Sequence, residues 1–406
     1  MLFKLGMKNL KQNLLMNILT ILQMSIVFVI LISIISTIVS RFTYYMPFKT
    51  FMNSNGYYYN MINAINPETG VTLRTKDEIC SMIEGEKDVI AEYDVFLDDI
   101  DNEQTNDTEK LHDKFISYDD EFAELFTPEL ESGHWFEVNS PTAETVPVVV
   151  TCNPYGLKTG DKIFLGLDGV GFNAEIIGII KDNTKILDTS LRSHNSLDYR
   201  NLYRDYSFER EGRPTFIMLQ KDLIDKPVIM QLNGNLLVTY DDSVTDEQIE
   251  LNDQILKKVR VQYFDSAANM KKNSLSYIFS QIRTLIPIFI SIFILTMVGA
   301  ISTSALSAKK QIKNYAIFYV CGLKWKQCAL INCWSSLICV SFSFVISLIS
   351  TLVIKQTGLF GRTVIELGIW QIIGCVIVVL LYMTLSMILP LQIVGKSTPN
   401  QVLKSN

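Results

Sequence analysis

Four long stretches without a single charged side chain constrain this chain more than any other feature. They are 27, 25, 28 and 29 residues long and comprise Leu14–Ser40, Thr284–Ala308, Gln327–Ile354 and Leu367–Gly395. Each is longer than the ~20 apolar residues that cross a hydrocarbon core of ~30 Å. Charged residues make up only 19% of the 406-residue chain, which is low for a soluble protein. We therefore predict an integral membrane protein with transmembrane helices at 14–40, 276–306, 327–354 and 367–395. The second of these includes the end of a helical stalk, because no proline or glycine interrupts the chain before it over 265–281.

The remaining charges predict the orientation of the four spans. Ten lysines and no acid occupy the leader 1–13, the link 307–326 and the tail 396–406. The insert 41–275 between the first two spans holds 23 basic and 41 acidic residues, a net charge of −18. Because short cytoplasmic segments are enriched in Lys and Arg, we expect both termini to be cytoplasmic. The insert and the short loop 355–366 are expected outside, as in a multi-pass membrane protein.

The first span and the cysteines each leave an alternative open. A cleaved signal peptide would share the basic leader, but the apolar stretch is longer than the usual 7–15 residues and no small-residue cleavage site follows, which favours a retained anchor. Only Cys80 and Cys152 of the seven cysteines lie in the insert. They could form a bridge, but so few cysteines favour two free thiols over a disulfide scaffold.

The two ends of the insert each show a β-α-β pattern, at about 41–99 and 234–265. Thr75 with Glu78, and Thr245 with Gln248, have the spacing of helix capping boxes. We predict strands at 56–63, 89–97, 235–240 and 259–264, and helices from Thr75 to near Gly85 and over 245–258. Both ends are expected to form one α+β subdomain, so the fold class is four transmembrane helices with a large α+β extracytoplasmic domain inserted between helices 1 and 2.

The middle of the insert, about 100–233, has the pattern of a second, β-rich subdomain. Strands are predicted at 145–152, 163–167 and 171–180, with a turn at Gly160-Asp161-Lys162. The segment 190–212 is polar and aromatic without periodicity, so a long loop is expected there. The acidic run 98–131 is interpreted as a solvated face rather than a site for a cationic ligand.

Signatures of catalysis are missing from the chain. The string Gly395-Lys396-Ser397-Thr398 lacks the first glycine and the strand–helix context of a phosphate-binding loop. His112, His134 and His194 are scattered and lack the spacing of metal ligands. We therefore expect a chain that is not an enzyme by itself, with no cofactor, no metal and no nucleic-acid partner.

The leader has the pattern of an amphipathic elbow helix at the membrane surface. Lys4, Lys8 and Lys11 are spaced by four and three residues, and the adjoining face carries Phe3, Met7, Leu10 and Leu14. The alternative is a basic flank without a fixed helix.

The link 307–326 is more elaborate than a turn between two spans requires. Ile312, Ala316, Tyr319 and Leu323 recur at helical spacing, beside Lys309, Lys310 and Lys313, and Gly322 stands where a helix commonly ends. We predict a short amphipathic coupling helix that lies across the cytoplasmic mouth and seats Ile312, Ala316 and Tyr319 in a soluble motor. A basic anchor that only touches lipid headgroups is the alternative.

Four segments together resemble the permeases of MacB/FtsX-type ABC transporters. The string 309–324 is similar to that family's cytoplasmic link, and Leu5–Asn13 resembles its N-terminal elbow. Gly133–Phe136, Pro147–Val150, Gly160–Lys162 and Ile176–Ile179 resemble the periplasmic core of the MacB branch, and Pro390–Leu403 resembles the family's ending. The chain departs from the pattern at Asn314, where an acid is usual, and at Tyr319, where an Arg is common.

The resemblance implies a location in a bacterial plasma membrane, a fold, a set of partners and a function. The ends of the insert would be a porter-like subdomain and its middle a Sabre-like one. The permease would pair with a second copy or a homologous permease in the membrane lipid and bind two cytoplasmic ABC ATPases through residues 309, 310, 312–316, 319 and 322, which include Tyr315. ATP hydrolysis would then move the external domain by mechanotransmission, giving efflux of a peptide, antibiotic or lipid-linked substrate and, for example, antimicrobial peptide resistance. The alternative is signalling without transport, with a sensor kinase, a cell-wall hydrolase or an extracytoplasmic adaptor as partner.

Overall fold

The computed structural model describes most of the chain and divides it into two compact units. The described residues are 10, 14–73, 75–96, 114–138, 140–151, 153, 155–167, 170–188, 197–205, 214–226, 229–357 and 368–396. One unit, which we call the membrane unit, comprises Met1–Phe42 and Ile278–Asn406, and the other, the α/β unit, comprises Thr43–Tyr277.

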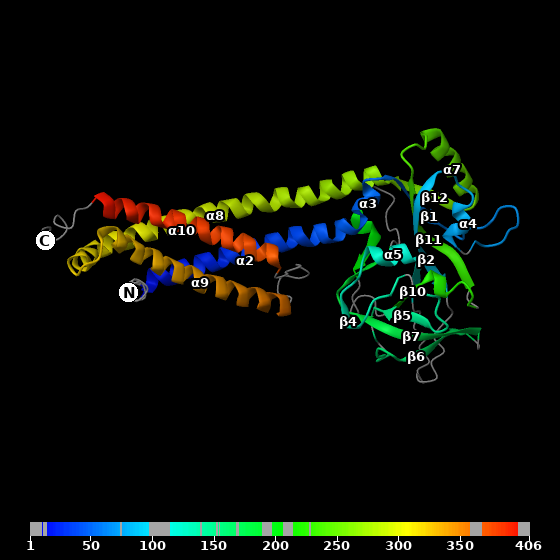
Figure 1. The fold of residues 1–406 in the computed structure, drawn as a ribbon, viewed down its shortest axis with the longest axis horizontal. Coiled ribbons are helices and arrows are strands. Elements are labelled where there is room, and N and C mark those ends of the chain that lie inside the picture. The colour runs from blue at the N-terminus through cyan, green and yellow to red at the C-terminus, as the bar shows by residue number, and fades with distance from the viewer. Residues whose placement is uncertain are drawn as a thin grey trace. The chain divides into compact units, whose positions relative to one another are not determined.

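The described part of the membrane unit is built from four long helices (Figure 1), namely α2 (Leu14–Tyr45), α8 (Ala267–Val320), α9 (Trp325–Thr357) and α10 (Ile369–Lys396). The end of α2 and the first residues of α8 belong to the α/β unit. All four are long and apolar enough to cross a membrane. Each predicted span lies within one of them, apart from the first residues of the fourth, and α8 extends beyond its predicted span at both ends. The backward extension of α8 confirms the helical stalk expected before the second span.

Both apolar side chains and hydroxyl groups hold the four helices together. Met24, Phe28 and Leu31 of α2 are buried in one cluster with Val340 of α9 and Val378 of α10. Hydrogen bonds from side chains cross between helices as well: Ser25 Oγ donates to the Ser343 carbonyl at 3.2 Å, and Gln371 Nε2 donates to Ser36 Oγ at 3.1 Å. Such hydrogen bonds stabilise helix association in a membrane, because apolar side chains contact lipid tails about as favourably as they contact another helix.

A single large sheet forms the centre of the α/β unit (Figure 1). Its strand order is β12-β1-β11-β2-β3-β10-β5-β7-β4, with β6 paired to β7. The strands are β1 (Asn55–Met61), β2 (Glu86–Phe96), β3 (Lys114–Tyr118), β4 (Leu130–Gly133), β5 (Val146–Val150), β6 (Lys162–Leu167), β7 (Val170–Ile180), β10 (Thr215–Leu219), β11 (Ile229–Tyr240) and β12 (Val261–Ser266). A separate two-stranded sheet pairs β8 (Lys185–Leu187) with β9 (Tyr203–Asp205).

Short helices connect these strands. The α-helices of the unit are α3 (Lys49–Met52), α4 (Lys76–Cys80), α5 (Asp120–Leu125) and α7 (Asp246–Lys258), and the 3-10 helices are η1 (Met46–Phe48), η2 (Tyr199–Leu202) and η3 (Gln220–Asp222).

The two ends of the insert come together as predicted. Strand β1 pairs antiparallel with both β11 and β12, and β11 pairs antiparallel with β2. Consequently β1 and β2 are parallel, separated by β11 and joined through α4, while β11 and β12 flank β1 and are joined through α7. This is a split β-α-β arrangement with the order of a ferredoxin-like sheet, and it confirms one subdomain built from both ends.

The predicted helix starts of this subdomain are present in the structure. Thr75 and Glu78 form the capping box of α4, and the Thr245 side chain accepts the Gln248 backbone N–H at 3.3 Å. Helix α4 ends at Cys80, earlier than predicted. Gly85 lies beyond it with φ +79° and takes part in the following turn, where a Cβ would come within 2.6 Å of Val244.

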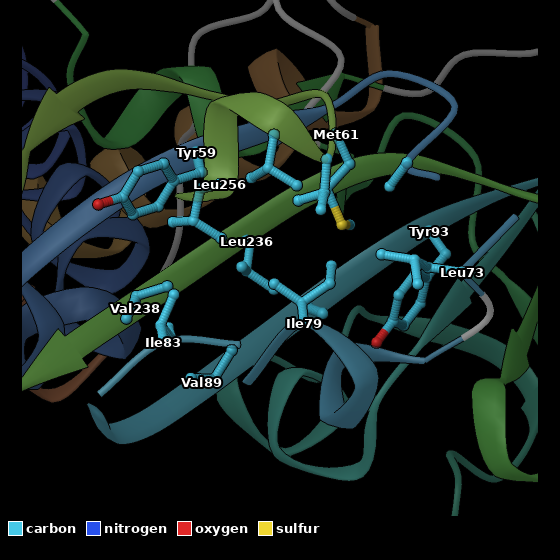
Figure 2. Close-up of a cluster of buried hydrophobic side chains, with 14 of the residues drawn as sticks. Tyr59, Met61, Leu73, Ile79, Ile83, Val89, Tyr93, Leu236, Val238 and Leu256 are labelled. Carbon is cyan, nitrogen blue, oxygen red and sulfur yellow. The ribbon is translucent and has the colours of Figure 1, made fainter. Parts of the chain in front are cut away.

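The core of this subdomain lies between the sheet and the two helices α4 and α7 (Figure 2). Tyr59, Leu236 and Val238 from the sheet pack with Ile79 and Leu256 from the helices, all of them at most 1% exposed. Full burial of a side chain of this size contributes about 1.5–3 kcal/mol. The side chains that these strands direct toward the two helices therefore form one apolar face of the sheet.

The middle of the insert has its own core but not its own sheet. The predicted strands β5, β6 and β7 are present, and Val148, Leu165, Ile176 and Phe216 are fully buried in a second cluster. The sheet is nevertheless continuous, since β2 pairs with β3. The two subdomains, with boundaries near residues 100 and 233, therefore have separate hydrophobic cores but share one sheet.

Two expectations about the middle were wrong in part. The acidic run 98–131, interpreted as a solvated face, contains β3 and α5, with Phe115, Ile116 and Phe122 buried. Of the predicted loop 190–212, residues 197–205 are described, and they form η2 and β9 with Tyr199 and Leu202 buried. Cys80 is a free thiol, which agrees with the favoured alternative, whereas Cys152 lies outside the described residues.

Candidate functional site

The last turns of α8 hold the residues predicted to meet a partner, and they differ from the prediction in one respect. Helix α8 runs without a break from Ala267 to Val320, so no separate coupling helix exists over 307–326. The periodic pattern correctly indicated a helix. The predicted start of that helix at residue 307 was wrong. No proline or glycine near residue 307 signals a helix boundary, and α8 continues through this position in the structure.

A Schellman motif ends the helix at the predicted glycine. The Leu323 N–H donates to the Phe318 carbonyl at 3.1 Å and the Gly322 N–H donates to the Tyr319 carbonyl at 3.0 Å. Gly322 has φ +102°, a left-handed conformation in which a Cβ is unfavourable. Immediately afterwards the Lys324 N–H donates to Gln327 Oε1 at 3.0 Å, which caps the start of α9.

Two opposite faces of these turns differ sharply in burial. The inward face consists of Ser304, Ala308, Gln311 and Tyr315, which are at most 6% exposed. The outward face carries Leu306, Lys310, Lys313, Ile317 and Val320, at spacings of four, three, four and three residues. On it, Leu306, Ile317 and Val320 are 45%, 52% and 70% exposed. We call this outward face the α8 end face.

The residues predicted to contact the motor, Ile312, Ala316 and Tyr319, lie at the border between these two faces. Ala316 is 0% exposed, Ile312 and Asn314 are half-buried, and Tyr319 is 45% exposed. Ala316 is therefore fully buried within this chain and offers no surface to a partner. Periodicity alone located the helix but could not tell which stripe the other helices of the membrane unit cover.

The α8 end face combines positive charge with exposed apolar side chains. Lys309, Lys310 and Lys313 are exposed, and none forms an ion pair with a described residue. An uncovered face of this kind favours a partner that has both an apolar groove and acidic groups at its rim. The elbow residues Lys4, Lys8 and Lys11 lie outside the described residues.

The α/β unit offers charged clusters whose groups are already engaged with one another. Asp119 accepts the Ala91 and Phe122 backbone N–H groups at 2.6 and 2.7 Å and lies 2.9 Å from Lys76 Nζ. Burial raises the pKa of Asp119 to about 6. Because both carboxylate oxygens accept hydrogen bonds from neighbouring elements, this residue ties α4, β2 and α5 together, which is a structural role. Within the described part of the chain, no group of three or more His, Cys, Asp or Glu side chains could hold a metal ion.

Comparisons with known proteins give structural neighbours for about half of the chain. No protein-family model and no curated protein matches it. The extracellular domain of the noncanonical ABC-type transporter YknZ from Gram-positive bacteria matches with a TM-score of 0.30 and 12% identity, over 52% of this chain and 100% of that one. The periplasmic region of MacB from Actinobacillus actinomycetemcomitans matches with a TM-score of 0.30 and 10% identity, over 55% and 94%.

A domain of a putative permease from Porphyromonas gingivalis gives a similar result, with a TM-score of 0.29, 12% identity and coverage of 53% of this chain and 90% of that one. All three neighbours are parts of transporters or permeases by description. Similarity this distant assigns neither family nor activity, so a function for this chain has to rest on its own residues.

Proposed function

We propose that this chain is the membrane-embedded permease subunit of an ABC transporter and that a separate cytoplasmic ATPase docks on the α8 end face. The observation that carries the proposal is the exposure of Ile317 and Val320 beside Lys310 and Lys313. These residues lie at the end of the second span, and the charge distribution predicts that this end is cytoplasmic. The sequence resemblance to MacB/FtsX-type permeases supports the same partner. Two ATPases and a second permease copy would complete the assembly.

Helix α8 also supplies the connection that such a subunit needs. It begins directly after β12, the edge strand of the sheet, and reaches the α8 end face without a loop. A helix of 54 residues is about 80 Å long. We propose that closure of the ATPases moves α8 and, through it, the α/β unit. The movement would expel a peptide, antibiotic or lipid-linked substrate, a step that rests on the sequence resemblance.

Co-purification of the chain with its ATPase tests the docking step. Ile317→Asp and Val320→Asp each place an unpaired carboxylate in the proposed contact, where burying it is unfavourable. We expect at least a tenfold loss of association for each, equivalent to about 1.4 kcal/mol. Val71→Asp is the matched control, because Val71 is 63% exposed in the α/β unit and Val320 is 70% exposed. Normal association of both α8 variants would refute the docking site.

The lipid-anchor alternative makes a different prediction for the lysines. Near an anionic membrane surface each Lys contributes about 1 kcal/mol, so changing Lys309, Lys310 and Lys313 to Gln would be the most damaging change of all. In a docking site these exposed charges contribute only ~0–1 kcal/mol each. A loss of association in the triple Gln variant together with normal association in Val320→Asp would therefore favour the anchor over the docking site.

A further inference from the structure

A small, partly open cavity in the membrane unit is lined by residues of all four long helices. Its volume is about 30 Å³, and hydroxyl and amide groups line most of it. Six lining residues carry its chemistry, namely Asn17 and Thr20 of α2, Ser304 of α8, Ser335 and Cys339 of α9, and Tyr382 of α10. These positions lie near the start of α2 and α9 and toward the end of α8 and α10, which is the half of the bundle predicted to be cytoplasmic.

Three of the hydroxyl-bearing side chains around the cavity, those of Thr20, Ser304 and Ser335, are buried. Thr20 Oγ1 donates to the Met16 carbonyl at 3.0 Å, and Ser304 Oγ donates to the Ser386 carbonyl at 2.8 Å. Ser335, on the α9 side of the cavity, is 5% exposed. Buried hydroxyls are nearly always hydrogen-bonded, and in a membrane the surrounding hydrocarbon provides no partner.

The size and lining of the cavity identify its occupant. A space of at least about 10–15 Å³ with two to four polar partners holds a water molecule, so this one has room for one or two. A cation is disfavoured because no carboxylate is among the described residues that line the space. We propose that the cavity is a hydrated site, in which water bridges the hydroxyl groups that α2, α8, α9 and α10 contribute to its lining.

Two native cysteines provide a matched probe of this hydration. Cys339 lines the cavity and is 2% exposed, whereas Cys375 is 1% exposed and belongs to the apolar cluster of the same unit. The experiment uses the full chain in lipid vesicles, in two variants that retain only Cys339 or only Cys375, with the remaining cysteines replaced by Ala. The rate of modification by a small neutral methanethiosulfonate is measured for each.

Hydration should make Cys339 the more reactive of the two. Only the thiolate reacts, and a thiol in apolar surroundings ionises poorly, so we expect Cys339 to react at least about tenfold faster than Cys375. Equal rates, or faster reaction at Cys375, would overturn the proposal. This comparison leaves the lining hydroxyls intact, so it does not depend on how a cavity variant folds.

Filling the cavity gives the second test. Ser335→Leu adds an apolar side chain to the space, and we expect it to slow modification of Cys339 to the rate of Cys375. Ser341→Leu is the control, because Ser341 is exposed on the same helix and does not line the cavity; it should leave the rate unchanged. An unchanged rate in a folded Ser335→Leu variant would contradict a water-filled cavity at this position.

Discussion

Replacement of Asp188 by Asn should strongly destabilise the α/β unit. The Asp188 side chain is 0% exposed and accepts from Lys114 Nζ at 2.6 Å and from Arg204 Nη1 at 3.1 Å. These contacts link β3 of the large sheet to the β8–β9 pair. Asp188 therefore holds the small sheet against the large one through two cations at once.

The expected magnitude follows from what the substitution leaves behind. Removing one partner of a buried ion pair costs about 3–5 kcal/mol because the remaining charge is uncompensated. The Lys114 and Arg204 side chains keep 26% and 21% exposure, so each cation can partly recover hydration. We therefore expect a loss at the lower end, about 3 kcal/mol in the free energy of unfolding of the α/β unit.

The pH dependence has a defined sign. The nearby cations lower the pKa of Asp188 in the folded protein, in spite of its burial, from an ordinary value of 3.8. The contribution of the carboxylate is therefore fully present above the unfolded pKa and is lost as the pH falls through the folded one. The difference between wild type and Asp188→Asn should shrink when the pH is lowered below about 4.

Urea unfolding followed by Trp135 fluorescence measures this effect. Trp135 lies in the α/β unit and the other three tryptophans lie outside it, so replacing those three by Phe isolates the signal. Asp242→Asn, at an exposed position, is the control and should change stability by less than about 0.5 kcal/mol. A loss in Asp188→Asn no greater than in this control would refute the reasoning.

Three further predictions concern the membrane unit. A cysteine introduced at the exposed Glu250 should react with an impermeant maleimide in intact cells while native Cys321 is spared, and the reverse would overturn the predicted orientation. Gly322→Val should reduce the stability of the turn after α8 by about 1–2 kcal/mol, because Gly322 has a left-handed conformation, and should weaken ATPase association. Unaltered association would show that this turn does not contribute to docking. The purified chain alone should hydrolyse no ATP, and turnover that disappears in Lys396→Ala would contradict this.

Local signals in the sequence located the elements whose cause is local. The uncharged stretches indicated the membrane helices, the pair Thr75 and Glu78 indicated the start of α4, and Gly322 indicated the end of α8, because each effect acts within a few residues. Strand β3 and helix α5 were missed because their few apolar residues, such as Phe115 and Phe122, stand in an acidic surrounding that masked the pattern.

The pairing of strands that are far apart in the sequence could not be predicted from local patterns. Nothing in the local pattern of β3 indicates that it pairs in parallel with β10, about 100 residues later. This pairing, together with that of β2 and β3, makes the sheet continuous. The docking residues show the same limit. Ala316 and Ile317 are neighbours in sequence, but one is fully buried and the other is 52% exposed, which only the packing of the membrane unit decides.

Cross-linking from Cys321 tests the central claim most directly. This native cysteine is exposed directly after the last residue of α8, next to the α8 end face. A short photoreactive reagent attached to it in inverted membrane vesicles should form an adduct with an ABC ATPase, identified by mass spectrometry, and Val320→Asp should abolish that adduct. Adducts with lipid alone, while the ATPase is present and active in the same vesicles, would contradict docking on the α8 end face.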